Sequence, residues 1–320
     1  MDLLPVEIKV NIESDVAAAL SLLGAAHGLM TTRQIWFAED RDGAAEGQVR
    51  LLDAGVIVRF RTGGGPDDLT VKLRPCTRKQ LVGRFSAPFG AEPFTYRIEE
   101  DWSVNHRVLA ASLVHGHAPG ALLDAVIPGA DPTAPIDAVQ NQFLHACAPA
   151  VQLGGLVALG PIRATKVDDV PLGDLKVDLE AWSVAGLEFL ETSIRVKPKD
   201  EDDAQRFTTR AEHKQRKLEE TVRGHGVACS PSTPRTRPDA SSTPWWRPSG
   251  AGRVTGSPSP TDGRAVRGSL AARVAGFCML PNTAVSSRAE TVPYVIGSKE
   301  LTWISICAET PGTLPRPGER

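Results

Sequence analysis

The sequence predicts an α+β fold, an antiparallel eight-stranded β-barrel with helices packed outside it. Many short segments alternate between apolar and polar residues, which is the period of a half-buried strand. Clusters of Gly and Pro separate these segments and mark turns. Ionisable residues stand near the centres of six of the segments, so the polar face of the sheet is charged along its whole width. A barrel would place that face around a common lumen.

The elements follow from period and punctuation. Alternation predicts strands over 6–12, 33–40, 94–104, 156–167, 175–184 and 186–196, and a hairpin over 58–74 with its turn in "GGGPDD". Helical spacing predicts helices over 16–28, 135–149 and 203–226. Ser14 or Asp15 would cap the first helix, and Gly224 would stop the last one. The segment 107–116 fits a helix or a strand equally well.

The composition changes near residue 226. Residues 1–226 have the periodicity of one folded domain, whereas 227–320 begin with a long stretch rich in Pro, Ser, Thr, Gly and Arg. Such a stretch has too little apolar area to offset its chain entropy, so we expect a mostly disordered tail. An out-of-frame translation of a GC-rich coding sequence would also produce this composition.

Totals over the chain limit the class of protein. The net charge of −2 over 320 residues argues against non-specific nucleic-acid binding as the main role, and we expect no specific nucleic-acid partner. Five cysteines without a CxxC pair favour a reducing compartment. The N-terminal residues lack the pattern of a signal peptide, and no apolar run is long enough to span a membrane. We therefore expect a cytoplasmic protein.

The hairpin carries four cations on one face: Arg59, Arg61, Lys72 and Arg74. Like charges on neighbouring strands destabilise a sheet, so either carboxylates elsewhere in the fold or an external polyanion must neutralise them. Without a ligand these cations should repel one another, and removing one should leave the stability of the fold nearly unchanged.

Other strands place carboxylates on the corresponding face. The opposite faces are apolar, and we expect Ile57, Val71 and Leu190 to point toward the helices. On any single strand, charges that simply face water are an adequate explanation. Six such strands favour a shared lumen, because cations could hold a polyphosphate there while carboxylates hold a divalent metal.

Several motifs appear in a characteristic order: "PVEIK", "RFR", "TVK", "RIEED", "KVDLE" and "FLETS". In this order the chain resembles the CYTH domain superfamily, the triphosphate tunnel metalloenzymes, over roughly residues 5 to 222. "VKLRP" and the segment from Leu159 to Lys166 also resemble a bacterial subgroup of that superfamily. The resemblance implies a tunnel-shaped barrel that binds a small-molecule triphosphate or polyphosphate together with Mg²⁺ or Mn²⁺.

The resemblance also implies roles for individual residues. It implies catalytic roles for Lys9 and Glu191. It implies substrate binding by Lys9, Arg59, Arg61, Lys72, Arg74 and Lys166. It implies metal binding by Glu7, Glu99, Asp101, Glu180 and Glu191.

The expected activity is metal-dependent hydrolysis of a triphosphate, either inorganic tripolyphosphate or an organic one. Two departures from the family pattern stand out. Pro5 replaces the first Glu of the E-x-E-x-K motif, and "WFAEDRDGAAEGQ" replaces an aromatic-Asp-Thr stretch. Two alternatives stay open: the resemblance also permits adenylate cyclase activity on ATP, and Pro5 motivates a polyphosphate-binding module that has lost turnover.

Overall fold

A computed structural model describes residues 3–103, 106–229, 270–271 and 273–274, and all of them belong to one compact unit spanning residues 1–284. The strands are β1 (Val6–Ile12), β2 (Leu29–Asp40), β3 (Val56–Thr62), β4 (Asp67–Cys76), β5 (Phe89–Ala91), β6 (Phe94–Ser103), β7 (His106–His117), β8 (Leu156–Leu172), β9 (Leu175–Val184) and β10 (Leu187–Val196). The α-helices are α1 (Val16–Leu22), α2 (Arg41–Ala45), α3 (Arg50–Asp53), α4 (Leu123–Val126), α5 (Ala138–Cys147) and α6 (Ala204–Gly224).

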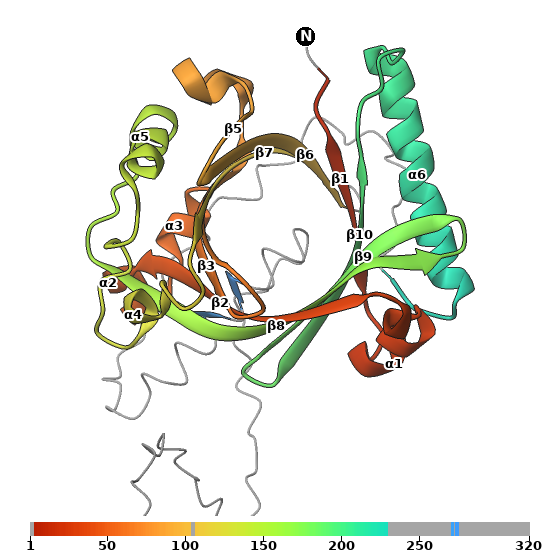
Figure 1. Cartoon of the computed structure of the whole chain (residues 1–320), viewed down its shortest axis with the longest axis horizontal. Coiled ribbons are helices and arrows are strands. Elements are labelled where there is room, and N and C mark those ends of the chain that lie inside the picture. Colours follow the sequence, from red (N-terminus) through yellow and green to blue (C-terminus); the bar gives the residue numbers. More distant parts are fainter. Residues whose placement is uncertain (1–2, 104–105, 230–269, 272, 275–320) are drawn as a thin grey trace, which may run out of the picture. The chain divides into compact units, whose positions relative to one another are not determined.

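The predicted barrel is confirmed, and its details differ from the expectation. The strand order is β1-β10-β9-β8-β2-β3-β4-β7-β6, and a parallel pairing of β1 with β6 closes the ring, as Figure 1 shows. Nine strands therefore form the barrel, and β5 pairs with β6 outside it. The ambiguous segment 107–116 lies in strand β7, which supplies one of the strands that the prediction did not count.

The outer face of the barrel carries most of the hydrophobic core. Helix α5 packs its Phe143 into a buried cluster with Phe60 and Val71, and α6 packs Leu218 against the cluster that contains Ile8 and Leu190. In Figure 1 these two helices flank opposite sides of the ring. Fully burying one such side chain stabilises the fold by about 1.5–3 kcal/mol, so these contacts hold the strands closed.

One expected orientation is wrong. Ile57 does not point to the outer helices, because it lies two residues from Arg59 and four from Arg61 on β3 and so shares their face. It is 6% exposed and belongs to a separate buried cluster at the lumenal side of β2, β3, β8 and β9. One end of the lumen is therefore apolar, although the other end is charged.

Helix α6 begins where the sequence predicts. The Asp203 side chain accepts a hydrogen bond from the Arg206 backbone N–H at 2.8 Å, which caps the first turn. Beyond the helix, the Glu13 N–H donates to the Ala228 carbonyl at 2.8 Å, and Cys229 forms a bridge with Ile12. The three residues that follow position 226 therefore extend along β1.

The predicted boundary at residue 226 stays a prediction, since the expected disorder and the possible frame shift concern residues mostly outside the described ranges. The described residues 270–271 and 273–274 are helical and contribute buried side chains to the core. In the described part of the chain, no helix has both the length and the apolar character needed to cross a membrane.

Candidate functional site

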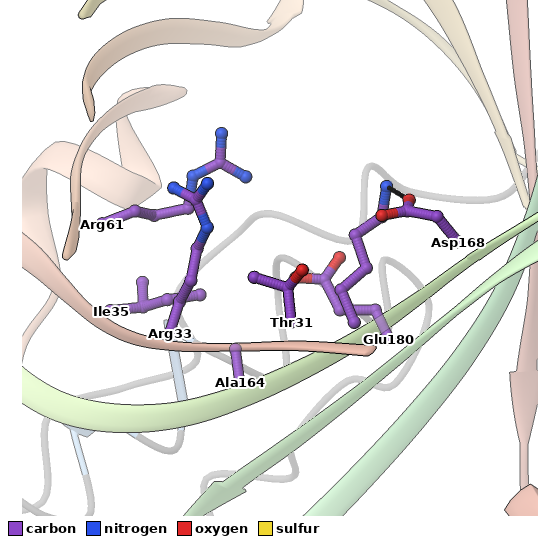
Figure 2. A pocket seen from close by; sticks show the side chains of 8 residues that line it. Thr31, Arg33, Ile35, Arg61, Ala164, Asp168 and Glu180 are labelled. Carbon is purple, nitrogen blue, oxygen red and sulfur yellow. Dashed lines mark hydrogen bonds and ion pairs between the residues drawn. The ribbon is translucent and has the colours of Figure 1, made fainter. Parts of the chain in front are cut away.

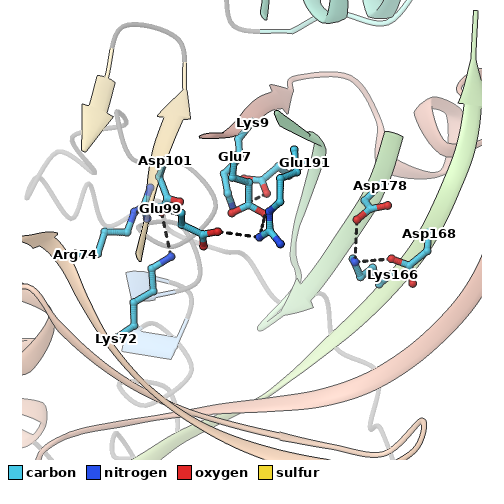
Figure 3. Close-up of polar contacts among 11 residues, drawn as sticks. Glu7, Lys9, Lys72, Arg74, Glu99, Asp101, Lys166, Asp168, Asp178 and Glu191 are labelled. Carbon is cyan, nitrogen blue, oxygen red and sulfur yellow. Dashed lines mark hydrogen bonds and ion pairs between the residues drawn. The ribbon is translucent and has the colours of Figure 1, made fainter. Parts of the chain in front are cut away.

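Four strands bring charged side chains to one region of the lumen, shown in Figure 3. Because alternate residues of a strand share a face, each strand contributes a pair with one residue between its members. The pairs are Glu7 and Lys9 on β1, Lys72 and Arg74 on β4, Glu99 and Asp101 on β6, and Glu191 and Ser193 on β10. Arg195 follows on the same face of β10. The prediction missed Arg195, although its spacing from Glu191 could have revealed it.

Three carboxylates converge at the closure of the barrel. Glu7 and Asp101 are direct neighbours in the parallel β1–β6 register, and Glu99 precedes Asp101 on the same face. One oxygen from each of the three lies within 4.8 Å of the others. Asp101 is 2% exposed, and its buried Oδ1 has no hydrogen-bond partner among the described residues. Hard divalent cations prefer such oxygen ligands, so these three residues fit a divalent metal ion.

Pro5 lies just before this triad. Its backbone carbonyl accepts a hydrogen bond from the Glu100 N–H at 2.9 Å and so helps to join β1 to β6. Position 5 precedes Glu7 by two residues, and it offers no side-chain ligand there. Glu99 and Asp101 on the neighbouring strand supply the other two carboxylates of the triad.

The cations of this region are paired with its carboxylates. Asp101 Oδ2 accepts a hydrogen bond from Lys72 Nζ at 3.0 Å and lies 2.8 Å from Arg74 Nε. Burial alone would raise the pKa of Asp101, but Lys72, Arg74 and Lys9 outweigh it and lower the pKa to about 2. Asp101 therefore offsets the repulsion between Lys72 and Arg74, so carboxylates within the fold are what neutralises these two cations in the empty protein.

Glu191 occupies a different position from the triad. It is 3% exposed; its Oε1 accepts a hydrogen bond from Lys9 Nζ at 2.9 Å, whereas its buried Oε2 has no partner among the described residues. Burial raises the pKa of the Glu191 carboxyl to about 7, although the Lys9 ammonium opposes the shift. Burial acts to lower the pKa of Lys9, but Glu191 and Glu7 outweigh it and raise that pKa. A carboxyl group that titrates near neutrality, as that of Glu191 does, suits proton transfer.

A second charged region lines a cavity of about 240 Å³, drawn in Figure 2. Its walls carry Arg33, Arg61, Lys166, Asp168 and Glu180, and Ile35 and Ala164 form its apolar part. The predicted residues Arg61, Lys166 and Glu180 thus lie together here. Arg59 is two residues from Arg61 on the same face of β3.

The cations of this cavity also have acidic partners. Arg61 Nε lies 2.8 Å from Asp68 Oδ2, which Arg33 Nη1 approaches at 3.3 Å. Lys166 Nζ contacts Asp178 at 3.0 Å and also binds Asp168. Sequence reasoning missed Asp68 and Arg33. It placed Asp68 in the hairpin loop, although β4 begins at Asp67, and it did not select Arg33, whose spacing from Ile35 puts both on the lumenal face.

Comparisons with family models and with curated proteins find no match. Solved structures give likenesses of fold. A Hippeastrum protein, HpAC1, described as a candidate adenylyl cyclase with a dominant triphosphatase activity, is 15% identical with a TM-score of 0.44, over 73% of this chain and 93% of that chain. A candidate adenylate cyclase of Bacillus halodurans is 12% identical with a TM-score of 0.40, over 73% and 97%.

The PH1819 protein of Pyrococcus horikoshii is 14% identical with a TM-score of 0.32, covering 69% of this chain and 91% of that chain. These likenesses concern the fold alone. A closed barrel with a charged lumen is the fold that the resemblance of the sequence motifs to the CYTH superfamily implies.

Proposed function

We propose that the protein hydrolyses a triphosphate in the lumen of its barrel with the help of Mg²⁺ or Mn²⁺. The observation that carries this proposal is the triad of Glu7, Glu99 and Asp101. A buried Asp101 oxygen there has no partner among the residues that the structure describes, while cations lie directly beside it. A buried polar atom without a partner is costly, and a metal ion would satisfy it.

Substrate binding would exchange ion-pair partners. The phosphate oxygens of a polyanion would attract Lys72 and Arg74 away from Asp101 and form charge-assisted hydrogen bonds with them. The carboxylates released in this way would hold the divalent cation. When bound, that ion neutralises charge on the phosphates and polarises the phosphorus–oxygen bonds. Lys9, Arg59, Arg61 and Lys166 are the further cations that we assign to the phosphate chain.

Glu191 would act on the water molecule. Its Oε2 is free of protein partners among the described residues, and its pKa of about 7 allows it to accept a proton from an attacking water at neutral pH. Lys9, hydrogen-bonded to the other oxygen, would hold the Glu191 carboxylate in place and stabilise its charged form. Glu180 lines the second charged region, so we assign it to metal or water at that end of the phosphate chain.

Pro5 favours a second candidate, a module that binds polyphosphate without turnover, because no carboxylate stands at this position. The experiment that separates the candidates is a screen of inorganic and organic triphosphates with Mg²⁺ and with Mn²⁺. Released phosphate is measured for hydrolysis, cyclic AMP for cyclase activity on ATP, and a thermal shift for binding.

Lys72→Ala should lose both the thermal shift and the phosphate release. Lys79→Ala, which removes an exposed cation outside the lumen, serves as the matched control and should behave like the parent. A thermal shift without phosphate release under either metal would establish the binding module. If tripolyphosphate gives no shift in the parent, the proposed function is wrong.

A further inference from the structure

The lumen has an apolar end that the charged site does not explain. Strand register places Ile35 opposite Arg61 and Phe37 opposite Arg59, so these apolar residues point into the lumen as the arginines do. Ile57 and Trp182 complete this end, and all four side chains are at most 7% exposed. The ring centroids of Phe37 and Trp182, from different strands, lie 6.0 Å apart.

Residues far beyond the barrel contribute to this buried cluster. Leu270 and Ala271 are 1% exposed and Val274 is 2% exposed, and all three belong to the cluster that contains Ile35 and Trp182. Arg273 Nη1 donates a hydrogen bond to the Gly47 carbonyl at 2.7 Å, which ties the segment to the α2–α3 connection. Ala44, Val49 and Leu52 of that region belong to the same cluster.

Solvent reaches the charged end of the same lumen. The side chains of Arg33, Arg61 and Lys166 are 26%, 28% and 39% exposed around the 240 Å³ cavity. Ile35, at 0% exposure, lines this cavity and also belongs to the apolar cluster. The cavity therefore ends against the cluster to which Leu270, Ala271 and Val274 contribute.

We propose that Leu270, Ala271 and Val274 close the apolar end of the lumen together with α2 and α3, and that this closure restricts the substrate to phosphate chain ends. The proposal rests on the proposed function, because it concerns which triphosphate groups enter that site. A lumen open at both ends could hold any internal stretch of a long polyphosphate, since the chain could pass through. A lumen with one mouth can hold only a terminus or a short triphosphate.

The difference can be measured as a dependence of affinity on chain length. In an open tunnel, the number of binding positions on one polyphosphate molecule grows with its length, and the affinity per molecule grows with it. In a closed lumen, each molecule offers two ends whatever its length. The parent should therefore bind polyphosphate of about 100 units within roughly twofold to threefold of its affinity for tripolyphosphate, counted per molecule.

The test uses the full chain with Leu270→Asp, which puts a charge into the cluster, and Leu123→Asp as the control. Leu123 is 43% exposed on α4, so the same substitution there should change nothing. Leu270→Asp should bind an apolar dye such as anilinonaphthalene sulfonate at least about threefold more strongly than the control. It should also favour the long polyphosphate over tripolyphosphate by about tenfold per molecule.

Leu270→Ala provides a milder variant if the charged one does not fold, as judged by circular dichroism, and it should show the same changes in smaller degree. Dye binding and chain-length preference equal to those of the parent in a folded variant would overturn the proposal. If the parent binds no tripolyphosphate at all, the proposed function fails, whereas the dye measurement still decides whether this segment closes the lumen.

Discussion

Replacing Asp101 by Asn should destabilise the empty protein. Asp101 is almost fully buried between Lys72 and Arg74, and its pKa falls from 3.8 to about 2. Since each pKa unit corresponds to 1.36 kcal/mol, the charged carboxylate contributes about 2–3 kcal/mol to folding that a neutral amide would not. For a domain of this size, that loss should lower the melting temperature by about 5–10 °C.

The pH dependence of stability has a definite sign. Because the pKa of Asp101 is lower in the folded state than in the unfolded state, its contribution is present above about pH 4 and disappears as the pH falls toward about 2. The difference in stability between the parent and Asp101→Asn should shrink over that acidic range. Asp174→Asn, which removes an exposed carboxylate paired with Lys217, is the control and should melt close to the parent.

The same variant distinguishes a structural from a functional role of the cations. In EDTA, Asp101→Asn should bind tripolyphosphate more tightly than the parent does, because Lys72 and Arg74 no longer have a competing carboxylate. With Mg²⁺ or Mn²⁺ it should release little phosphate, since the triad has lost a charged ligand. Isothermal titration calorimetry and a phosphate assay give both results. This role of Asp101 is refuted if the variant has the same melting temperature as the parent at neutral pH, or if it binds tripolyphosphate less tightly than the parent in EDTA.

Three further outcomes follow from the site. Arg61→Ala should weaken tripolyphosphate binding by about one to two decades in calorimetry, since a charge-assisted contact is worth roughly 1.5–3 kcal/mol. The melting temperature should change little, because the ion pair that Arg61 forms with Asp68 is partly exposed. An unchanged dissociation constant would exclude this arginine from the phosphate site. Glu191→Gln should abolish phosphate release while tripolyphosphate still shifts the melting temperature, and normal turnover would exclude Glu191 as the base. In the parent, kcat/KM should rise with pH through about 7, because burial raises the pKa of Glu191 to about 7 and the base must be ionised; a flat profile there would contradict this role.

Strand alternation predicted which charged side chains share the lumenal face. It could do so because these residues alternate with apolar residues along each strand. Glu7, Lys9, Lys72, Glu99 and Asp101 occur with single-residue spacing on strands whose other face is apolar, so their common orientation was readable from the sequence. The sequence did not show that Glu7, Glu99 and Asp101 converge, because their contact depends on the parallel β1–β6 pairing between residues more than 90 positions apart.

The errors have two physical reasons. Ile57 was assigned to the outer face because it is apolar, although its parity with Arg59 places it in the lumen. The lumen changes from charged to apolar along its length, and residue chemistry alone does not report such a change. Asp68, at the start of β4, and the buried side chains of Leu270, Ala271 and Val274 were missed because contacts made by strand ends and distant segments leave no periodic pattern in the chain.

The position of β1 between β6 and β10 has a consequence for biosynthesis. Strand β1 leaves the ribosome before the other strands, yet one of its partners ends at Ser103 and the other at Val196. No nascent chain that ends before β10 is complete can close the ring, and until then the carboxylates of β1 and β6 have no complete set of neighbours. Such long-range pairing slows folding and leaves unpaired strand edges exposed to other nascent chains. Until the ring closes, the apolar face of β1, formed by Val6, Ile8, Val10 and Ile12, stays uncovered and offers a chaperone a surface to bind.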